Sequence, residues 1–99
     1  MSRPKNYWFF TAKSMVGRYY QIKQGRSRQE KIWTKAIDQA LEETSKQDNG
    51  SYKVSAVRAV LLDNRLTTLG AANELHYSER TIRRWTEDFV NLAGKKAGY

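Results

Sequence analysis

The chain has 99 residues, a formal net charge of +8 and no cysteine, which excludes disulfide bonds and thiolate metal sites. Its single histidine argues against a zinc site built from protein ligands alone. Hydrophobic residues make up 39% of the chain, too many for a fully disordered protein, yet no run reaches the roughly 18 apolar residues of a membrane span. We therefore expect one small domain in the cytoplasm, with no membrane association and no metal.

The positive charge is concentrated at the start of the chain. Residues 1–31 hold eight Lys/Arg and one Glu (+7), residues 32–65 hold five of each sign (0), and residues 66–99 hold five basic and four acidic residues (+1). Such an excess favours a polyanionic partner, most often nucleic acid. The alternative is a protein that is merely basic and soluble.

Helical spacing predicts a first helix over about residues 5–23, with Pro4 in its first turn. The run YWFF at 7–10 places four large apolar side chains in a row, so some must be exposed or covered by a partner. The apolar stripe comprises Trp8, Ala12, Met15, Tyr19 and Ile22, and is widened by Phe9, Val16 and Tyr20.

After a polar connection at 24–29, a second helix is predicted over about residues 28–46. The segment 45–52 is the clearest boundary, because Asn49-Gly50 favours a positive φ that ends a helix. A third helix is predicted over about 53–64. The broad apolar face of the second helix comprises Ile32, Trp33, Ala36, Ile37, Ala40, Leu41 and Thr44.

The last part of the chain predicts a short helix over 68–75, capped by Thr67, and a longer one over 79–92, capped by Ser78. No strand-like alternation is visible, so the expected fold is all-α, with four to five helices. We expect an N-terminal basic and aromatic helical pair at 1–47, a helix-turn-helix unit at 51–92, and a flexible tail at 93–99.

Residues 68–87 meet the requirements of a DNA-binding helix-turn-helix. Small Ala72 stands at the fifth position, where the two helices approach closely, and Tyr77 is placed to anchor the turn. One position departs from the usual pattern: the ninth commonly needs a positive φ and is often Gly, whereas here it is His76. His tolerates this conformation better than most residues, so the turn can form with some strain or a slightly altered shape. The alternative is an ordinary helix corner. The residues expected to pin the two helices together are Leu69, Leu75, Ile82 and Trp85.

In a helix-turn-helix, the second helix enters the major groove by its N-terminal residues. Arg80 and Arg83 are best placed to pair with guanine, Glu79 can accept from cytosine, and Arg84 lies nearer phosphate or simply faces solvent. Hydroxyl groups near the helix N-termini can bond phosphates. The predicted DNA-binding residues are Thr67, Thr68, Ser78, Glu79, Arg80, Thr81, Arg83 and Arg84.

The string VRAVLLDNRLTTLGAANELHYSERTIRRWTEDFV, within residues 54–92, resembles region 4 of sigma-70-type factors. It also resembles the C-terminal part of bacteriophage late-gene transcription activators of the ArpU and RinA type. The pattern S-x-x-T-I-x-R-W occurs as well in resolvase-like and transposase-like modules and in phage small terminase subunits. The resemblance implies binding to a phage or bacterial promoter in the host cytoplasm, with contact to RNA polymerase.

The leading hypothesis is a sequence-specific transcription regulator that binds double-stranded DNA. The alternatives are a DNA-recognition subunit for packaging or recombination, and a protein-interaction module. The first two helices are open to three roles: tracking DNA phosphate, forming a homodimer, or contacting a protein such as polymerase. Catalysis is disfavoured, because the chain has one His, no Cys and no Gly-rich phosphate loop. No cofactor is expected.

Overall fold

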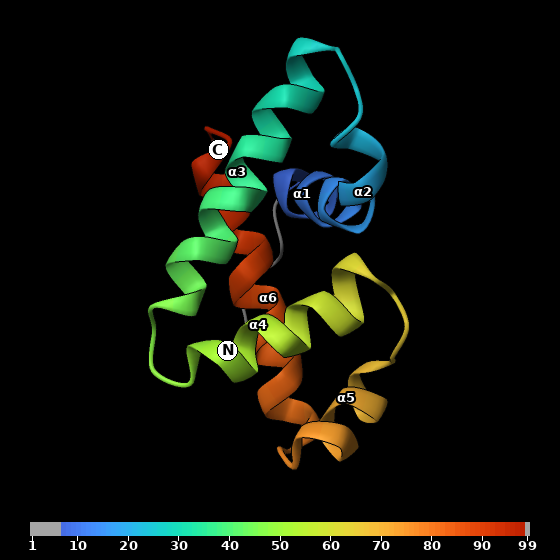
Figure 1. Cartoon of the computed structure of the whole chain (residues 1–99), viewed down its shortest axis with the longest axis vertical. Coiled ribbons are helices and arrows are strands. Elements are labelled where there is room, and N and C mark those ends of the chain that lie inside the picture. Colours follow the sequence, from blue (N-terminus) through green and yellow to red (C-terminus); the bar gives the residue numbers. More distant parts are fainter. Residues whose placement is uncertain (1–6, 99) are drawn as a thin grey trace.

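The computed structural model describes residues 7–98, with the side chains from Trp8 onward. The described chain is helical and contains no strand, which confirms the all-α prediction (Figure 1). Pro4, the predicted helix start near residue 5, and Tyr99 lie outside the described residues. The elements are α1 (Tyr7–Gly17), α2 (Tyr19–Ile22), α3 (Arg28–Ser45), α4 (Gly50–Val57), the π-helix η1 (Arg58–Leu62), α5 (Thr68–Leu75) and α6 (Glu79–Lys96).

The first predicted helix is interrupted at Arg18, which separates α1 from α2. The Arg18 N–H donates to the carbonyls of both Ser14 and Met15, so the helix loses its regular hydrogen bonding there. Of the YWFF run, Phe9 is buried and Phe10 is 61% exposed, as the sequence required. The predicted stripe is shifted, because Trp8 and Met15 are only half-buried and Tyr20 is exposed. The buried residues are Phe9, Ala12, Val16, Tyr19 and Ile22.

Two tyrosine–carboxylate pairs fix α2 to its neighbours. Tyr19 Oη donates to Asp38 on α3, and Tyr20 Oη donates to Asp63 after η1, at 2.6 Å. Burial of Tyr19 and its hydrogen bond to Asp38 raise the pKa of Tyr19 to about 12. The Asp63 hydrogen bond raises the pKa of the exposed Tyr20 as well.

Helix α3 begins and ends within one residue of its predicted bounds. Ser27 caps it in a capping box: its Oγ accepts from the Glu30 N–H at 3.1 Å, and the Glu30 carboxylate accepts from the Ser27 N–H. Trp33 and Ile37 are fully buried in the main core. Ile32, expected on the apolar face, is 38% exposed instead, because it lies to one side of the buried face of α3.

The turn before α4 depends on one left-handed residue and on one close backbone approach. Asn49 is left-handed, with φ 58°, as the Asn-Gly pair predicted. A Cβ on Gly50 would lie 2.2 Å from the Ser45 carbonyl oxygen, so no larger residue fits there. Helix α4 therefore starts three residues before the predicted position 53. It continues into η1, where the Asp63 N–H donates to the Arg58 carbonyl at 2.7 Å.

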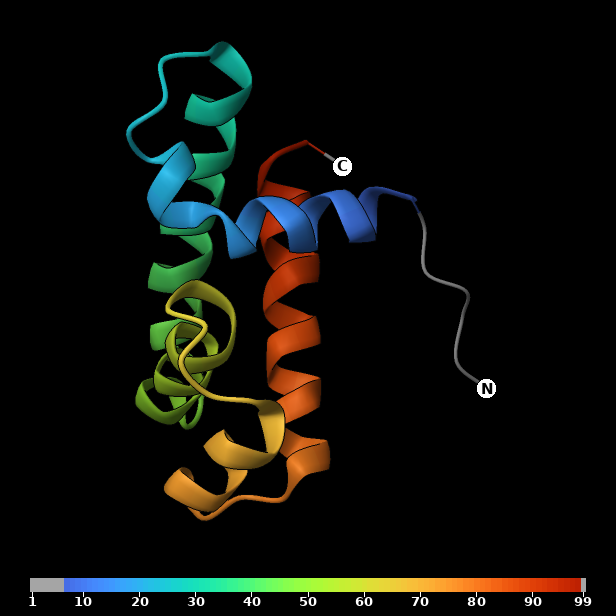
Figure 2. The same cartoon turned by 90° about the vertical axis from the view of Figure 1, so that its right-hand side faces the viewer.

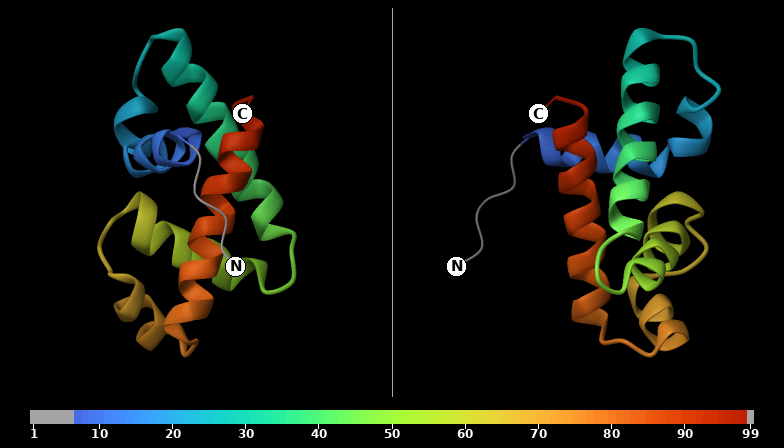
Figure 3. Two further views of the ribbon diagram at one scale, coloured as in Figure 1. Left: turned by 180° about the vertical axis from the view of Figure 1, so that it is seen from behind. Right: turned by 60° about the vertical axis from the view of Figure 1, so that its left-hand side comes forward.

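Helix α6 runs to Lys96, so the helix end predicted at 92 and the tail predicted from 93 are wrong. Ala93 is fully buried, and a Cβ on Gly94 would lie 2.5 Å from the ring of Trp8. Lys96 also forms an ion pair with Glu43 of α3 at 2.7 Å. These tertiary contacts extend the helix. Figures 2 and 3 show α1 crossing the C-terminal half of α6.

The interior consists of two hydrophobic clusters. The larger cluster joins α1, α2, α3, α4, η1 and α6, so residues on both sides of the predicted 47–51 boundary share one core. The smaller cluster lies under the corner between α5 and α6; it consists of Ala56, Ala71, Ala72, Ile82 and Trp85. No helix among residues 7–98 is long and apolar enough to cross a membrane. Within the same residues, no three His, Asp or Glu side chains are grouped to hold a metal.

Candidate nucleic-acid interface

Helices α5 and α6 are joined by residues 76–78 and are capped at both N-termini. Thr67 Oγ1 accepts from the Gly70 N–H at 3.0 Å, and Ser78 Oγ accepts from the Thr81 N–H at 3.1 Å. Both caps were predicted from the sequence, and both are confirmed. Each cap satisfies one otherwise unpaired N–H at the start of its helix and fixes where that helix begins.

The turn itself has the conformation that the ninth position required. His76 is left-handed, with φ 62° and ψ 39°, and its N–H donates to the Ala72 carbonyl. The Tyr77 N–H donates to the same carbonyl at 3.1 Å. A left-handed non-glycine residue costs about 1–2 kcal/mol, which these two hydrogen bonds and the packing of the corner offset.

The corner is held by the smaller hydrophobic cluster. Ile82 is fully buried and Trp85 is 9% exposed, which confirms their predicted inner positions. The ring of Tyr77 lies edge-on to Trp85, with 4.7 Å between centroids, so Tyr77 anchors the turn as expected. Leu69 does not pin the helices, since it is 55% exposed on a different face of α5 from the buried pair Ala71 and Ala72.

Two arginines extend from the outward face of the N-terminal half of α6. Arg80 and Arg84 are exposed, and they stand four residues apart, which places them one above the other on the same face. Neither makes an ion pair with another residue of the described chain. The sequence instead predicts Arg80 and Arg83 as the pair that faces guanine, with Arg84 near phosphate or facing solvent.

Arg83 is differently placed. Its guanidinium lies 3.5 Å from the Glu79 carboxylate, in a pair whose side chains are 60% and 44% exposed. Such an exposed pair is weak and gives way easily to a stronger anion. Arg83 also lines a hollow of about 280 Å³ together with Lys13 of α1 and Thr68 of α5. Lys13 is not among the DNA-binding residues predicted by number, because nothing in the sequence indicates that α1 lies beside this face of α6.

The hydroxyl groups of the predicted site are mostly engaged within the protein. Thr67 and Ser78 are exposed but accept the capping hydrogen bonds, and Thr81 Oγ1 lies 2.8 Å from Ser78 Oγ. Thr68 is half-buried at the rim of the hollow. The groups free for an outside partner are therefore the guanidinium groups of α6 more than the hydroxyls.

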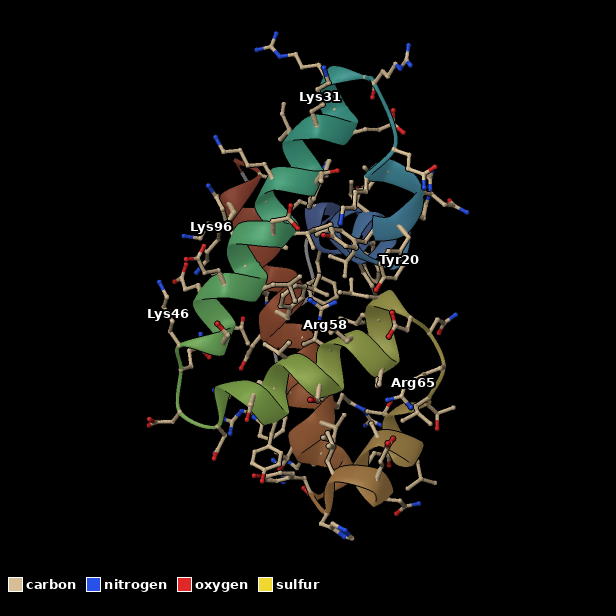
Figure 4. The ribbon with its side chains drawn as sticks, viewed as in Figure 1. Tyr20, Lys31, Lys46, Arg58, Arg65 and Lys96 are labelled. Carbon is tan, nitrogen blue, oxygen red and sulfur yellow. The ribbon has the colours of Figure 1, made fainter. Side chains whose placement is uncertain are left out.

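A second cationic cluster lies at the opposite end of the molecule, around the start of α3. Arg28, Lys31 and Lys35 are all exposed at positions i, i+3 and i+7 of that helix. Figure 4 shows Lys31 at the end of α3 farthest from α5. The sequence places the excess charge in residues 1–31 but does not by itself indicate one surface. The i, i+3, i+7 spacing of Arg28, Lys31 and Lys35 is the signal that could have predicted this one.

No protein-family model matches the chain, and no curated protein or solved structure shows significant similarity to it.

Proposed function

We propose that the chain is a sequence-specific DNA-binding transcription regulator that reads the major groove with the N-terminal half of α6. The observation that carries the proposal is the pair Arg80 and Arg84, exposed on one helix face next to a capped three-residue turn. A guanidinium group is the side chain that most often pairs with guanine O6 and N7, by two parallel hydrogen bonds. A recognition helix that begins at a tight turn presents its first residues to base edges.

The remaining predicted residues contribute position and charge in this proposal. Arg83, held at rest by Glu79, moves to a DNA phosphate when a duplex arrives, because phosphate is the stronger and more exposed anion. Lys13 stands on the same side of α6 and adds a second phosphate contact. Glu79 is left to accept a hydrogen bond from a cytosine N4 amino group.

The partners of such a regulator include proteins as well as DNA. Phe10 is 61% exposed on α1, and burial of this ring against a protein is favourable. In the cytoplasm of a bacterial host, which the sequence resemblance implies, that protein is a second copy of the chain or RNA polymerase.

The proposal is tested by fluorescence anisotropy with a preferred duplex selected from a random pool and with a scrambled duplex of equal length. The variant Arg80→Ala/Arg84→Ala is compared with Arg18→Ala/Lys46→Ala, which removes the same charge at exposed positions outside α5 and α6. We expect the first variant to lose the preference for the selected duplex and the second to keep it.

Either of two results contradicts the proposal. If Arg80→Ala/Arg84→Ala binds both duplexes as the wild type does, α6 is not the reading helix. If light scattering on the same sample gives a large ring that binds all duplexes equally, a packaging role replaces regulation. Absence of binding at about 50 mM salt, where phosphate contacts are strong, points instead to a protein-interaction module.

A further inference from the structure

The start of α3 presents a row of cations to solvent. Arg28, Lys31 and Lys35 lie on the face of α3 opposite its buried residues Trp33 and Ile37. At 1.5 Å per residue the row spans about 10 Å along the helix axis. Together with Arg26 and the partly exposed Ile32, it lines an open hollow of about 400 Å³.

The acidic residues nearest this row are already engaged. The Glu30 carboxylate accepts from the Ser27 N–H at 3.3 Å, Asp38 accepts from Tyr19, and Glu42 pairs with Lys46 at 3.3 Å. Within residues 7–98, none of the three cations of the row has an ion-pair partner. Lys31 and Lys35 do share a hollow with Asp38 and Glu42, but no ion pair joins them, so the three cations of the row stay available to an outside anion.

The row points away from the arginines of α6. Helices α3 and α6 pack against each other through their buried faces, which share the larger core, so their outward faces are turned apart (Figures 1 and 2). The row is also near one end of the 39 Å long axis, whereas α6 begins at the other end. DNA has a persistence length of about 150 base pairs, so a short duplex docked on α6 cannot bend round to reach α3.

We propose that the α3 row binds the phosphate backbone of a second DNA duplex, so that one chain bridges two DNA segments. The inference rests on the proposed function for the first segment. A span of about 10 Å covers about three successive phosphates of one strand, which lie 3.4 Å apart along the duplex axis. Lysine ammonium groups bind phosphate as point charges without directional pairing, so this contact carries no sequence preference.

A membrane surface is the other polyanion that such a row can meet. Stable association with a bilayer needs an apolar helix face or a lipid anchor in addition to basic residues. The exposed apolar contribution here is one partly exposed side chain, Ile32. The charge pattern therefore fits a phosphate backbone better than a bilayer.

The test uses a duplex of about 16 base pairs tethered to beads, and a second, labelled duplex of the same length in solution. Three quantities are measured: protein retained on the beads, labelled duplex captured and, in a separate assay, protein bound to vesicles of anionic phospholipid. The variant Arg28→Gln/Lys31→Gln/Lys35→Gln is compared with Arg18→Gln/Lys46→Gln/Lys95→Gln, which removes the same charge at exposed positions outside the row.

We expect the row variant to stay on the beads but to capture the second duplex about tenfold less, while the control variant captures it as the wild type does. Full capture by the row variant overturns the inference, because bridging would then come from a dimer that presents two copies of α6. Loss of binding to vesicles of anionic phospholipid, with second-duplex capture unchanged, overturns it in favour of a membrane contact. Unchanged retention and capture by Arg80→Ala/Arg84→Ala would instead contradict the proposed function.

Discussion

The two cationic surfaces differ in residue type and in how they are supported. Arg80 and Arg84 stand at the start of α6, next to a turn fixed by a cap, a left-handed residue and a buried aromatic contact. The α3 row has two lysines and one arginine over an open hollow. Guanidinium groups form directional pairs, whereas ammonium groups act as point charges. Both surfaces are positively charged, so charge alone does not explain the proposed difference between base reading and phosphate binding. That proposal rests on the fixed turn beside Arg80 and Arg84 and on the two-pronged guanidinium group.

Exchanging arginine and lysine between the surfaces should give the largest effect. Arg80→Lys/Arg84→Lys keeps the charge but loses the bidentate fork, so we expect a loss of about 1–3 kcal/mol per pair on the preferred duplex. Binding to a scrambled duplex should hardly change. Lys31→Arg/Lys35→Arg on α3 is the control and should leave the preference intact. Anisotropy titrations measure the affinity of each variant for the preferred and the scrambled duplex. Equal losses of affinity of Arg80→Lys/Arg84→Lys on both duplexes would mean that α6 contributes only charge.

The capping serines support both surfaces, and each should contribute about 1 kcal/mol to folding. We expect Ser78→Ala and Ser27→Ala to lower the free energy of unfolding by about that amount, measured by urea denaturation. Ser55→Ala, at an exposed interior position of α4, is the control and should cause no loss. If neither cap variant lost stability, the hydrogen bonds to the Thr81 and Glu30 N–H groups would not matter in solution.

Burial of Tyr19, together with its hydrogen bond to Asp38 on α3, should make the free energy of unfolding depend on pH in the alkaline range. The pKa of Tyr19 is raised in the folded protein from 10.0 to about 12. A raised pKa means that this contribution is fully present below about pH 10 and is lost as the pH rises through 12. Tyr19→Phe should cost about 0.5–1.5 kcal/mol near neutral pH.

Urea denaturation of the wild type and of Tyr19→Phe at a series of pH values measures how the contribution of Tyr19 to the free energy of unfolding changes with pH. The difference between the two proteins should shrink as the pH rises from about 10 towards 12. Tyr52→Phe, at an exposed ring, is the control. A difference that stays constant over this range would show that the phenol proton does not stabilise the fold.

The smallest effect concerns Glu79, which neutralises part of the α6 surface. Glu79→Gln releases Arg83 and should change the free energy of unfolding by no more than about 0.5 kcal/mol, as expected for an exposed pair four residues apart. Binding to a scrambled duplex should strengthen slightly, and more at low salt, because a negative charge is removed. Binding to the preferred duplex should not share this gain, because a neutral amide accepts from cytosine N4 more weakly than a carboxylate does. Equal strengthening on both duplexes would show that Glu79 contacts no base.

The corner was predictable from sequence because its determinants are local. Thr67, Ser78 and His76 act on N–H groups and dihedral angles within four residues of themselves. The first half was predicted less well, because the packing partners of α1 are distant in the chain. Trp8 packs over Gly94, in the last turns of α6, which continues beyond residue 92 to Lys96.

At the site, too, some side-chain positions follow from the local sequence, whereas others depend on packing between distant parts of the chain. The common face of Arg80 and Arg84 follows from helical spacing alone. The shared hollow of Arg83 and Lys13 needs the crossing of α1 and α6, which no local pattern encodes. The exposed position of Leu69 depends on how α5 rests on Ala71 and Ala72, which are small enough to form the contact themselves.

The most direct test of the account is an NMR titration of the labelled protein with the preferred duplex. We predict that the first equivalent of DNA shifts the backbone amides of residues 79–88 most, and that further DNA then shifts those around residues 26–35. If the shifts from the first equivalent are centred elsewhere, or are spread evenly over the basic residues, α6 does not read DNA and the account is contradicted.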